Sequence, residues 1–343
     1  REQMKMALQK VATRLGEEYP LHMGSEKVYG DAKLKSWNPS QKDQVVGTFQ
    51  KATSAHVDQA IQTAYETFST WSKVSAEKRA EYLIKAAQWV RDHRYEMAAT
   101  MVYEVGKNWA EADGDVAEAI DFLEFYAREM LRYSAKQPLT RITQEENELV
   151  YLPLGVGAVI PPWNFPFAIL VGMTSAAIVT GNTVVLKPSS DAPLIAYQFV
   201  RLMEEIGLPA GVLNFVTGSG EEMGDALVSH PLTRFVCFTG SKEVGLHINQ
   251  LAATPVPGQR WIKRVVAEMG GKDAIVVDRD VDLDTVADGI VASAFGYQGQ
   301  KCSACSRAII HEDVYDSLVQ KIAERTQKLV VGNPTDPNTF MGP

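Results

Sequence analysis

The stretch VGAVIPPWNFPFAILVGMTSAAIVTGNTVVLKPSS, residues 156–190, contains two short apolar runs with one helix-length apolar segment between them. The runs lie at 156–160 and 183–187, and the segment at 167–180 separates them. Short apolar runs bounded by turn residues are typical of buried strands. A strand, a helix and a second strand at this spacing predict a right-handed crossover between two parallel strands.

The same alternation continues beyond this stretch. Apolar runs at 211–216 and 234–238 alternate with helix-length segments at 191–206 and 221–229. We therefore expect an α/β fold with a doubly wound parallel sheet, which binds ligands beyond the carboxyl ends of its strands. The N-terminal third differs, because amphipathic helical periodicity dominates it from Ser54 onward.

The sequence predicts two domains. Residues 1–268 would comprise the helical region and the parallel-sheet domain, and residues 269–343 would begin a second α/β domain. The strands expected in this second domain are 273–278 and 306–311, and the helices are 282–293 and 312–329. The domain ends in turn-rich sequence without a closing element, so we expect it to be incomplete.

Composition excludes several classes of protein. The chain has 34 basic and 42 acidic residues and no basic cluster, which argues against a nucleic-acid partner. Prolines interrupt the uncharged segment 151–186, and its unbroken part of 14 residues is shorter than the roughly 20 that a membrane-spanning helix needs. The first residues show no apolar leader, and three cysteines suit reduced thiols. A soluble cytoplasmic protein is expected.

Four turns follow the expected strands of the first domain, at the same edge of the sheet. Their sequences are VIPPWNFP, LKPSS, VTGSGEEMG and FTGSKEVG. The last two are rich in glycine and lead into helices, where free N–H groups and the helix dipole favour a phosphate. None contains G-x-G-x-x-G, and ordinary turn chemistry explains each one singly. Four such turns at one edge favour a dinucleotide cleft.

The segment GYQGQKCSACSR, residues 296–307, raises a separate question about its two cysteines. A zinc site would need further ligands, and a redox C-x-x-C normally opens a helix, whereas this pair precedes a strand. Cys302 lies on a loop framed by Gly296 and Gly299, so it is either an exposed nucleophile or a buried apolar residue. Cys305 is expected to pack, and Cys237 to lie in the core. No metal site is expected.

Glu268 ends an apolar strand in VVAEMGGKDAIVV. A buried carboxylate at this position destabilises the fold unless it contacts water or a hydrogen-bonding or charged partner. It is therefore a solvated strand end, a partner of Lys272, or a general base beside the thiol that follows 34 residues later.

Five motifs occur together and in order: PPWNFPF, GNTVVLKPS, FTGSKEVG, EMGGKDAIVV and GQKCSACSR. This set resembles the aldehyde dehydrogenase superfamily over most of the chain. CSACSR, EADGDVAEAIDF and KPSSDAP are similar to one branch of that family. The branch oxidises glutamate γ-semialdehyde, the open form of 1-pyrroline-5-carboxylate, to glutamate in proline and arginine catabolism.

The resemblance implies a catalytic role for three residues. Cys302 would be the nucleophile, with Cys305 a bystander, and its attack on the aldehyde would give an oxyanion that expels hydride. The side-chain amide of Asn164 and the backbone N–H of Cys302 would form the oxyanion hole. Glu268 would activate the water that hydrolyses the resulting thioester.

The resemblance also implies NAD as cofactor in the domain 1–268. Lys187 would bind the adenosine ribose, and Gly240 and Ser241 the pyrophosphate. Many NAD-specific members carry glutamate where this chain has Ser190, so NADP is expected to be accepted as well, with NAD preferred. The other implied cofactor contacts are Ile160, Pro161, Trp163, Gly220, Gly224, Phe238, Thr239, Val244, Met269 and Gly270.

Three residues are implied at the substrate: Phe165, Ser303 at the α-carboxylate, and Glu118, which faces either the substrate tunnel or solvent. The sequences of the family continue well beyond the position of Pro343, so these implications concern a longer parent enzyme, expected to be a homo-oligomer. Two alternatives stay open. One is another semialdehyde dehydrogenase, and the other is a catalytically silent scaffold of the same fold.

Overall fold

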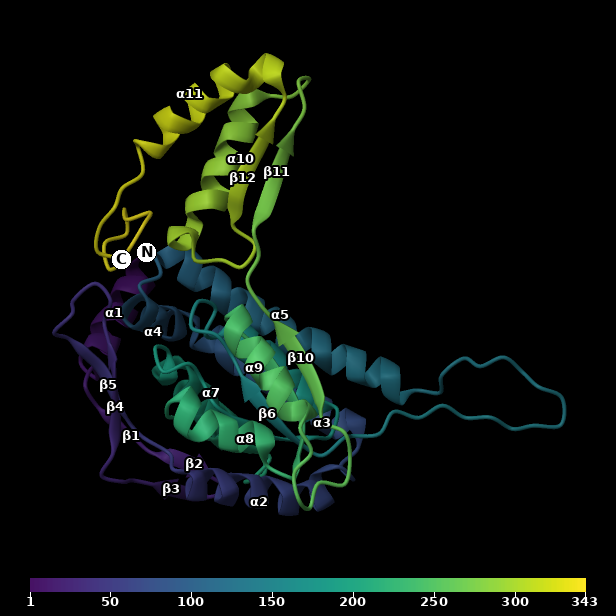
Figure 1. The fold of residues 1–343 in the computed structure, drawn as a ribbon. Coiled ribbons are helices and arrows are strands. Elements are labelled where there is room, and N and C mark those ends of the chain that lie inside the picture. Colours follow the sequence, from purple (N-terminus) through teal and green to yellow (C-terminus); the bar gives the residue numbers. More distant parts are fainter.

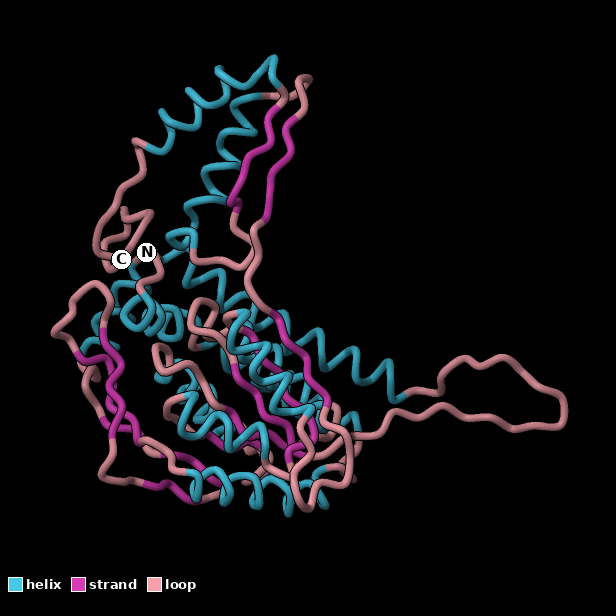
Figure 2. The backbone as a smooth tube through the Cα atoms, viewed as in Figure 1, coloured by secondary structure: helices cyan, strands magenta, loops and turns pink.

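The computed structural model describes residues 1–343 apart from the side chain at position 222. Its centre is a seven-stranded sheet, shown in Figures 1 and 2. The strands lie in the order β10 (Arg264–Glu268), β9 (Thr233–Thr239), β6 (Val156–Ile160), β7 (Thr183–Leu186), β8 (Leu213–Phe215), β2 (Leu21–Met23) and β3 (Glu26–Val28). The first five are parallel, and β2 and β3 join the edge as an antiparallel pair. The predicted α/β fold with a parallel sheet is confirmed.

Helices cover both faces of this sheet. On one face lie α6 (Ala168–Val179) and α7 (Pro193–Glu205), and on the other lie α2 (Ser54–Trp71), α8 (Asp225–Ser229) and α9 (Lys242–Ala253). Successive strand residues alternate between the two cores, so Val159 packs on the first face and Ala158 on the second. Burial on both faces explains why these strands are continuous apolar runs. A short π-helical turn, Gly220–Gly224, precedes α8.

A further helical layer packs outside α6 and α7. It contains α1 (Glu2–Ala12), α3 (Ala76–Asp92), α4 (Arg94–Val105) and α5 (Trp109–Ser134). The side chains of Thr53, Ser75 and Asn108 cap α2, α3 and α5, each accepting a backbone N–H three residues later. From the end of α5 the loop 135–155 extends away from the body of the molecule (Figure 1).

The helices α6 and α7 have no side-chain cap of their own. Two buried acidic side chains of the outer layer take that place. Asp115 of α5 accepts the N–H of Ala168 at 2.6 Å, and Glu104 of α4 accepts those of Leu194 and Ile195 at 2.6 and 2.9 Å. The outer layer therefore supplies the N-terminal caps of α6 and α7, the helices that follow β6 and β7 in the chain.

Short strands before Ser54 were not predicted. β1 (Glu18–Tyr19), β5 (Val45–Gln50) and β4 (Lys33–Trp37) form a separate three-stranded sheet. These strands, like β2 and β3, have two to six residues, too few for a clear periodicity.

The C-terminal part forms its own small layer above the sheet domain in Figure 1. β11 (Asp273–Val277) and β12 (Cys305–Ile310) are parallel, and α10 (Leu283–Phe295) and α11 (Tyr315–Thr326) accompany them. Single 3-10 turns, Gly296–Gly299 and Glu312–Val314, follow α10 and precede α11. Its buried core is separate and consists of Val277, Ala287, Ile290 and Leu318. The expected strands and helices are present, and the domain boundary after residue 268 stays our proposal.

Candidate active site

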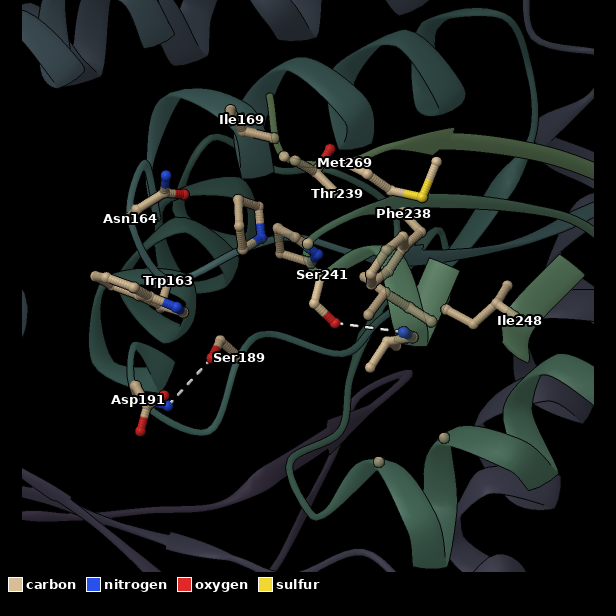
Figure 3. Close-up of a pocket in the computed structure, with 18 of the residues that line it drawn as sticks. Trp163, Asn164, Ile169, Ser189, Asp191, Phe238, Thr239, Ser241, Ile248 and Met269 are labelled. Atoms are coloured by element: carbon tan, nitrogen blue, oxygen red, sulfur yellow. Dashed lines mark hydrogen bonds between the residues drawn. The ribbon is translucent and has the colours of Figure 1, made fainter. Parts of the chain in front are cut away.

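The loops at the carboxyl ends of the parallel strands surround a cavity of about 1040 Å³ (Figure 3). All the residues expected to contact the cofactor line it: Ile160, Pro161, Trp163, Lys187, Ser190, Gly220, Gly224, Phe238, Thr239, Gly240, Ser241, Val244, Met269 and Gly270. Asn164 and Cys302 line the same cavity. The four turns and the cysteine loop, predicted independently, therefore meet at one place.

The N-terminus of α9 opens into this cavity. Ser241 caps the helix, and its Oγ accepts the N–H of Val244 at 3.3 Å (Figure 3). A Cβ at Gly240 would lie 2.6 Å from the ring of Phe238, so the ring occupies space that only glycine leaves. At Gly220, Gly224 and Gly270 a Cβ would meet no atom within 4 Å. These three positions border open space, which a ligand can approach closely.

Lys187 lies buried just after β7, and its Nζ donates to the carbonyl of Pro188 at 3.1 Å. Burial lowers the pKa of the Lys187 ammonium to about 8, and the carboxylate of Asp191 opposes that shift. Ser190 Oγ donates to the carbonyl of Gly218 at 3.4 Å, which ties two cavity loops together. Asp191 and Glu221 also line the cavity, so this end carries two acidic groups that the sequence did not assign to it.

Cys302 lies in a turn immediately before β12. A Cβ at Gly271 would lie 2.6 Å from the Cys302 carbonyl oxygen, so the chain after β10 passes directly against the cysteine loop. Among the described residues that line the cavity, Cys302 is the one cysteine. The thiol of Cys305 instead contacts the carbonyl of Arg307 at 3.3 Å, and burial raises the pKa of the Cys237 thiol to about 11.

Asn164 joins the loop after β6 to the cysteine loop. Its Nδ2 donates to the carbonyl of Gln300 at 2.8 Å, and its Oδ1 accepts the N–H of Phe165 at 3.1 Å. A primary amide nitrogen carries two hydrogens, and this bond uses one of them. The other can serve a ligand in the cavity.

Four expected residues are not among those that line the cavity. Glu268 ends β10 with an exposed side chain, while its backbone carbonyl accepts the N–H of Gly240 at 3.0 Å. Ser303 and Glu118 are exposed, and Phe165 is half-buried against the ring of Tyr297. The structure thus brings Cys302 and Asn164 into the same cavity as the expected cofactor residues, and the other four residues do not line it.

The cavity also contains residues without an expected role. Nε2 of His247 in α9 lies 2.9 Å from Oδ1 of Asp225 in α8 at its wall, and Gln300 presents a buried amide oxygen without a hydrogen-bond partner. Sequence periodicity marks which residues form a helix, but a lone histidine or glutamine carries no local signal for facing a cavity.

Metal-binding and membrane-spanning features are both missing from the described residues. No group of three histidine, cysteine, aspartate or glutamate side chains among them is arranged to hold a metal ion. No helix in this part of the chain combines the length and the apolar character that crossing a membrane requires.

Comparison with known sequences identifies the family. The model of the aldehyde dehydrogenase family matches residues 28–343. A 1-pyrroline-5-carboxylate dehydrogenase of Geobacillus thermodenitrificans is 56% identical over 337 residues, which cover 98% of this chain and 65% of the relative. One from Geobacillus kaustophilus is 55% identical and covers the whole chain. The chain thus spans about two thirds of the length of these relatives.

Solved structures agree with this match. A 1-pyrroline-5-carboxylate dehydrogenase from Thermus with bound NAD superposes with a TM-score of 0.97 at 47% identity, covering all of this chain and 66% of that one. A proline utilization A protein from Bdellovibrio bacteriovorus gives a TM-score of 0.96 at 43% identity, with 36% of its chain covered. From the family match, these relatives and the shared architecture, we conclude that the chain belongs to the aldehyde dehydrogenase family.

Proposed function

We propose that the parent enzyme of this chain oxidises glutamate γ-semialdehyde to glutamate with NAD. The observation that carries this proposal is the meeting of Cys302 and Asn164 at one end of a cavity whose other walls are the expected cofactor residues. Relatives above 50% identity that are named 1-pyrroline-5-carboxylate dehydrogenase support the substrate.

The cavity fits a dinucleotide. It is large, a capped helix N-terminus opens into it, and three glycines border its open space. We infer that Ser241 and the first turn of α9 would hold the pyrophosphate, because free N–H groups and the helix dipole favour an anion there. The buried Lys187 would donate to the ribose hydroxyls. NAD, when bound, supplies a hydride acceptor.

The reaction would begin at Cys302. Its thiolate forms a bond to the aldehyde carbon, and the carbonyl oxygen becomes an oxyanion. The free hydrogen of Asn164 Nδ2 and the backbone N–H of Cys302 would donate to that oxygen. When the oxyanion collapses, the carbon loses its hydrogen as hydride and remains attached to sulphur as a thioester.

Release of glutamate requires water. We propose that Glu268 takes a proton from this water, whose oxygen bonds to the thioester carbon, and the Cys302 thiolate leaves. Because the Glu268 side chain is exposed in this structure, it would have to turn toward the thioester for this step. Ser303 would hold the α-carboxylate of the substrate, and Phe165 and Glu118 would lie farther along the substrate path.

Acceptance of NADP beside NAD is part of the same proposal. Because Ser190 stands where many NAD-specific members carry glutamate, no carboxylate at this position repels a 2′-phosphate. The next residue of the cavity wall, Asp191, does carry a carboxylate. This carboxylate supports the expected preference for NAD.

We also propose that the parent enzyme is a cytoplasmic homo-oligomer that acts on a small molecule. The loop 135–155 supports self-association, because Ile142, Val150 and Leu152 are 50%, 59% and 77% exposed there.

Formation of NADH tests the activity. Glutamate γ-semialdehyde and NAD are added to the parent enzyme, to this chain and to Cys302→Ala of each. NADH formation that requires Cys302 supports the proposal. A higher kcat/KM with succinic semialdehyde than with glutamate γ-semialdehyde would assign another substrate. Binding of NAD without turnover by the parent enzyme would indicate a silent scaffold.

A further inference from the structure

We propose that Lys107 is a positioning residue that fixes both donors of the oxyanion hole, the amide of Asn164 and the backbone N–H of Cys302. This inference rests on the proposed function, because it concerns the oxyanion hole assigned there.

Lys107 lies in the turn between α4 and α5 and is fully buried. Its Nζ is 2.8 Å from Oδ2 of Asp115, whose side chain is also fully buried. The other oxygen of Asp115 accepts the N–H of Ala168, the first residue of α6. The ion pair is therefore anchored to the helix that follows the loop of Asn164.

The same ammonium group contacts one aromatic ring from each of the two catalytic loops. Its Nζ lies 3.9 Å from the ring centre of Phe165 and 4.5 Å from that of Tyr297, distances typical of cation–π contacts. Phe165 directly follows Asn164, and Tyr297 lies in the turn that leads to Cys302. The rings meet edge to face with their centres 6.2 Å apart. One buried cation thus joins the two loops.

The turn before Cys302 has a backbone conformation that needs such support. Tyr297 and Gln298 have φ values of 45° and 58°, a region that non-glycine residues adopt at a cost. The Tyr297 hydroxyl donates to the carbonyl of Val105 at 3.1 Å, and Gln298 Nε2 donates to that of Gly106 at 3.2 Å. The acceptors are the two residues before Lys107, so the α4–α5 turn holds the strained segment at three successive positions.

These contacts converge on the oxyanion hole. The bond from Asn164 to the Gln300 carbonyl links the two loops two residues before Cys302. A shift of either loop therefore changes the distance between the Asn164 amide and the Cys302 N–H. Since a displacement of about 1 Å can cost about 10²-fold in rate, loss of Lys107 should be seen in kcat.

A merely structural role predicts a different result, and Arg79 provides the matched control. Arg79 is another buried cation, and its Nε donates to the carbonyl of Val179 at the opposite end of α6. Lys107→Met and Arg79→Met each remove a buried cation from one end of the same helix. Both should lower the melting temperature.

The experiment compares these two variants of the parent enzyme in two reactions. Oxidation of glutamate γ-semialdehyde requires NAD, whereas hydrolysis of 4-nitrophenyl acetate at Cys302 uses the oxyanion hole without it. For Lys107→Met we expect kcat to fall about 10²-fold in both reactions, with the Kd of NAD nearly unchanged. For Arg79→Met we expect both kcat values to stay near wild type. Equal losses in the two variants, or unchanged kcat in Lys107→Met, would overturn the proposal.

Lys107→Met leaves Asp115 as an unpaired buried charge and can fail to fold. The double variant Lys107→Met/Asp115→Asn removes both charges and keeps an acceptor for the N–H of Ala168, so the same kcat criteria apply to it. One outcome separates the two proposals. In that outcome, wild type hydrolyses the ester with a kcat that falls in Lys107→Met, and yet does not oxidise the semialdehyde. The proposed function is then wrong, and the positioning role stands. If wild type oxidises the semialdehyde and neither variant loses kcat, the positioning role is wrong and the function stands.

Discussion

The side-chain amide of Asn164 donates a hydrogen bond of 2.8 Å to the backbone carbonyl of Gln300, which lies 136 residues later in the chain. This bond gives the asparagine two tasks, because one amide hydrogen holds the cysteine loop and the other is left for a ligand. An aspartate at this position has the same shape but no hydrogen to donate when ionised.

The kcat of the Asn164→Asp variant should therefore fall further than that of the Asn164→Ala variant. The aspartate would place a negative charge beside both the Gln300 carbonyl and the developing oxyanion. We expect kcat to fall about 10²- to 10³-fold in the alanine variant and further in the aspartate variant. Steady-state kinetics with saturating NAD measure this. Equal kcat for wild type and Asn164→Ala would contradict a role in the oxyanion hole.

The two cysteines of the C-x-x-C segment should differ sharply. Cys302→Ala removes the thiol that lines the cavity and is expected to abolish NADH formation, while NAD binding measured by calorimetry persists. Cys305→Ala removes a thiol that contacts its own strand, so its kcat/KM should stay near that of wild type. If Cys305→Ala lost activity while Cys302→Ala kept it, Cys302 would not be the nucleophile.

Gly271 should be intolerant of a side chain. A Cβ there would meet the Cys302 carbonyl, a backbone atom that cannot rotate away. Gly271→Ala is expected to lower the free energy of unfolding by about 1–3 kcal/mol and to reduce kcat by at least about tenfold.

Gly289 provides the control for that variant. It is exposed within α10, and a Cβ there would meet no atom within 4 Å. Because alanine favours helices over glycine, Gly289→Ala should raise the free energy of unfolding by up to about 1 kcal/mol. Denaturant unfolding measures both variants, and comparable destabilisation by both would refute the close contact at Gly271.

Glu104 should make stability depend on pH. Burial raises the pKa of its carboxyl group to about 8, although the N–H groups of Ile195 and Leu194 and the Ser36 hydroxyl oppose the shift. The native state therefore holds a proton that the unfolded state releases near its ordinary pKa of about 4.5, so this group's contribution to stability declines as pH rises from about 4.5 to about 8.

Glu104→Gln removes this titration and keeps an acceptor for the start of α7. The stability of wild type relative to Glu104→Gln should fall by up to about 1.4 kcal/mol per pH unit within that window. Denaturant melts at several pH values between about 5 and about 8 provide the measurement. A constant difference across the window would show that Glu104 does not titrate there.

Cofactor choice should depend on two adjacent positions. A carboxylate about 4 Å from the 2′-phosphate costs roughly 4 kcal/mol at an effective dielectric near 20. Ser190→Glu should therefore abolish the use of NADP and spare much of the rate with NAD, whereas Asp191→Ser should increase the ratio of kcat/KM for NADP to that for NAD. An unchanged ratio in both variants would place the discriminating group elsewhere in the cavity.

Strands β6, β7 and β9 were predictable because each is a short apolar run next to glycine, proline or asparagine. The parallel sheet follows from their spacing, and the position of the cleft follows from the sheet. The strands before Ser54 were not predictable because they are very short. In addition, β1 and β2 pair with strands that lie farther along the chain, β5 and β8.

Within the site, the loops were easier to predict than the side chains that face the cavity. Turn chemistry marks a loop such as 187–190, but the neighbouring Asp191 has no local feature that distinguishes it from a solvated residue. The Lys107–Asp115 pair was missed for the same reason. A lysine and an aspartate eight residues apart read as a solvated helix surface until the packing of α5 on α6 is known.

The helix caps supplied by Glu104 and Asp115 have a consequence for biosynthesis. Glu104 and Asp115 are synthesised before the helices that they cap, so both acceptors are present when α6 and α7 form. A segment that starts after α5 would expose uncapped N–H groups and the apolar faces of α6 and α7. The parallel sheet, which often folds independently in other architectures, here depends for its completion on the polypeptide translated before it.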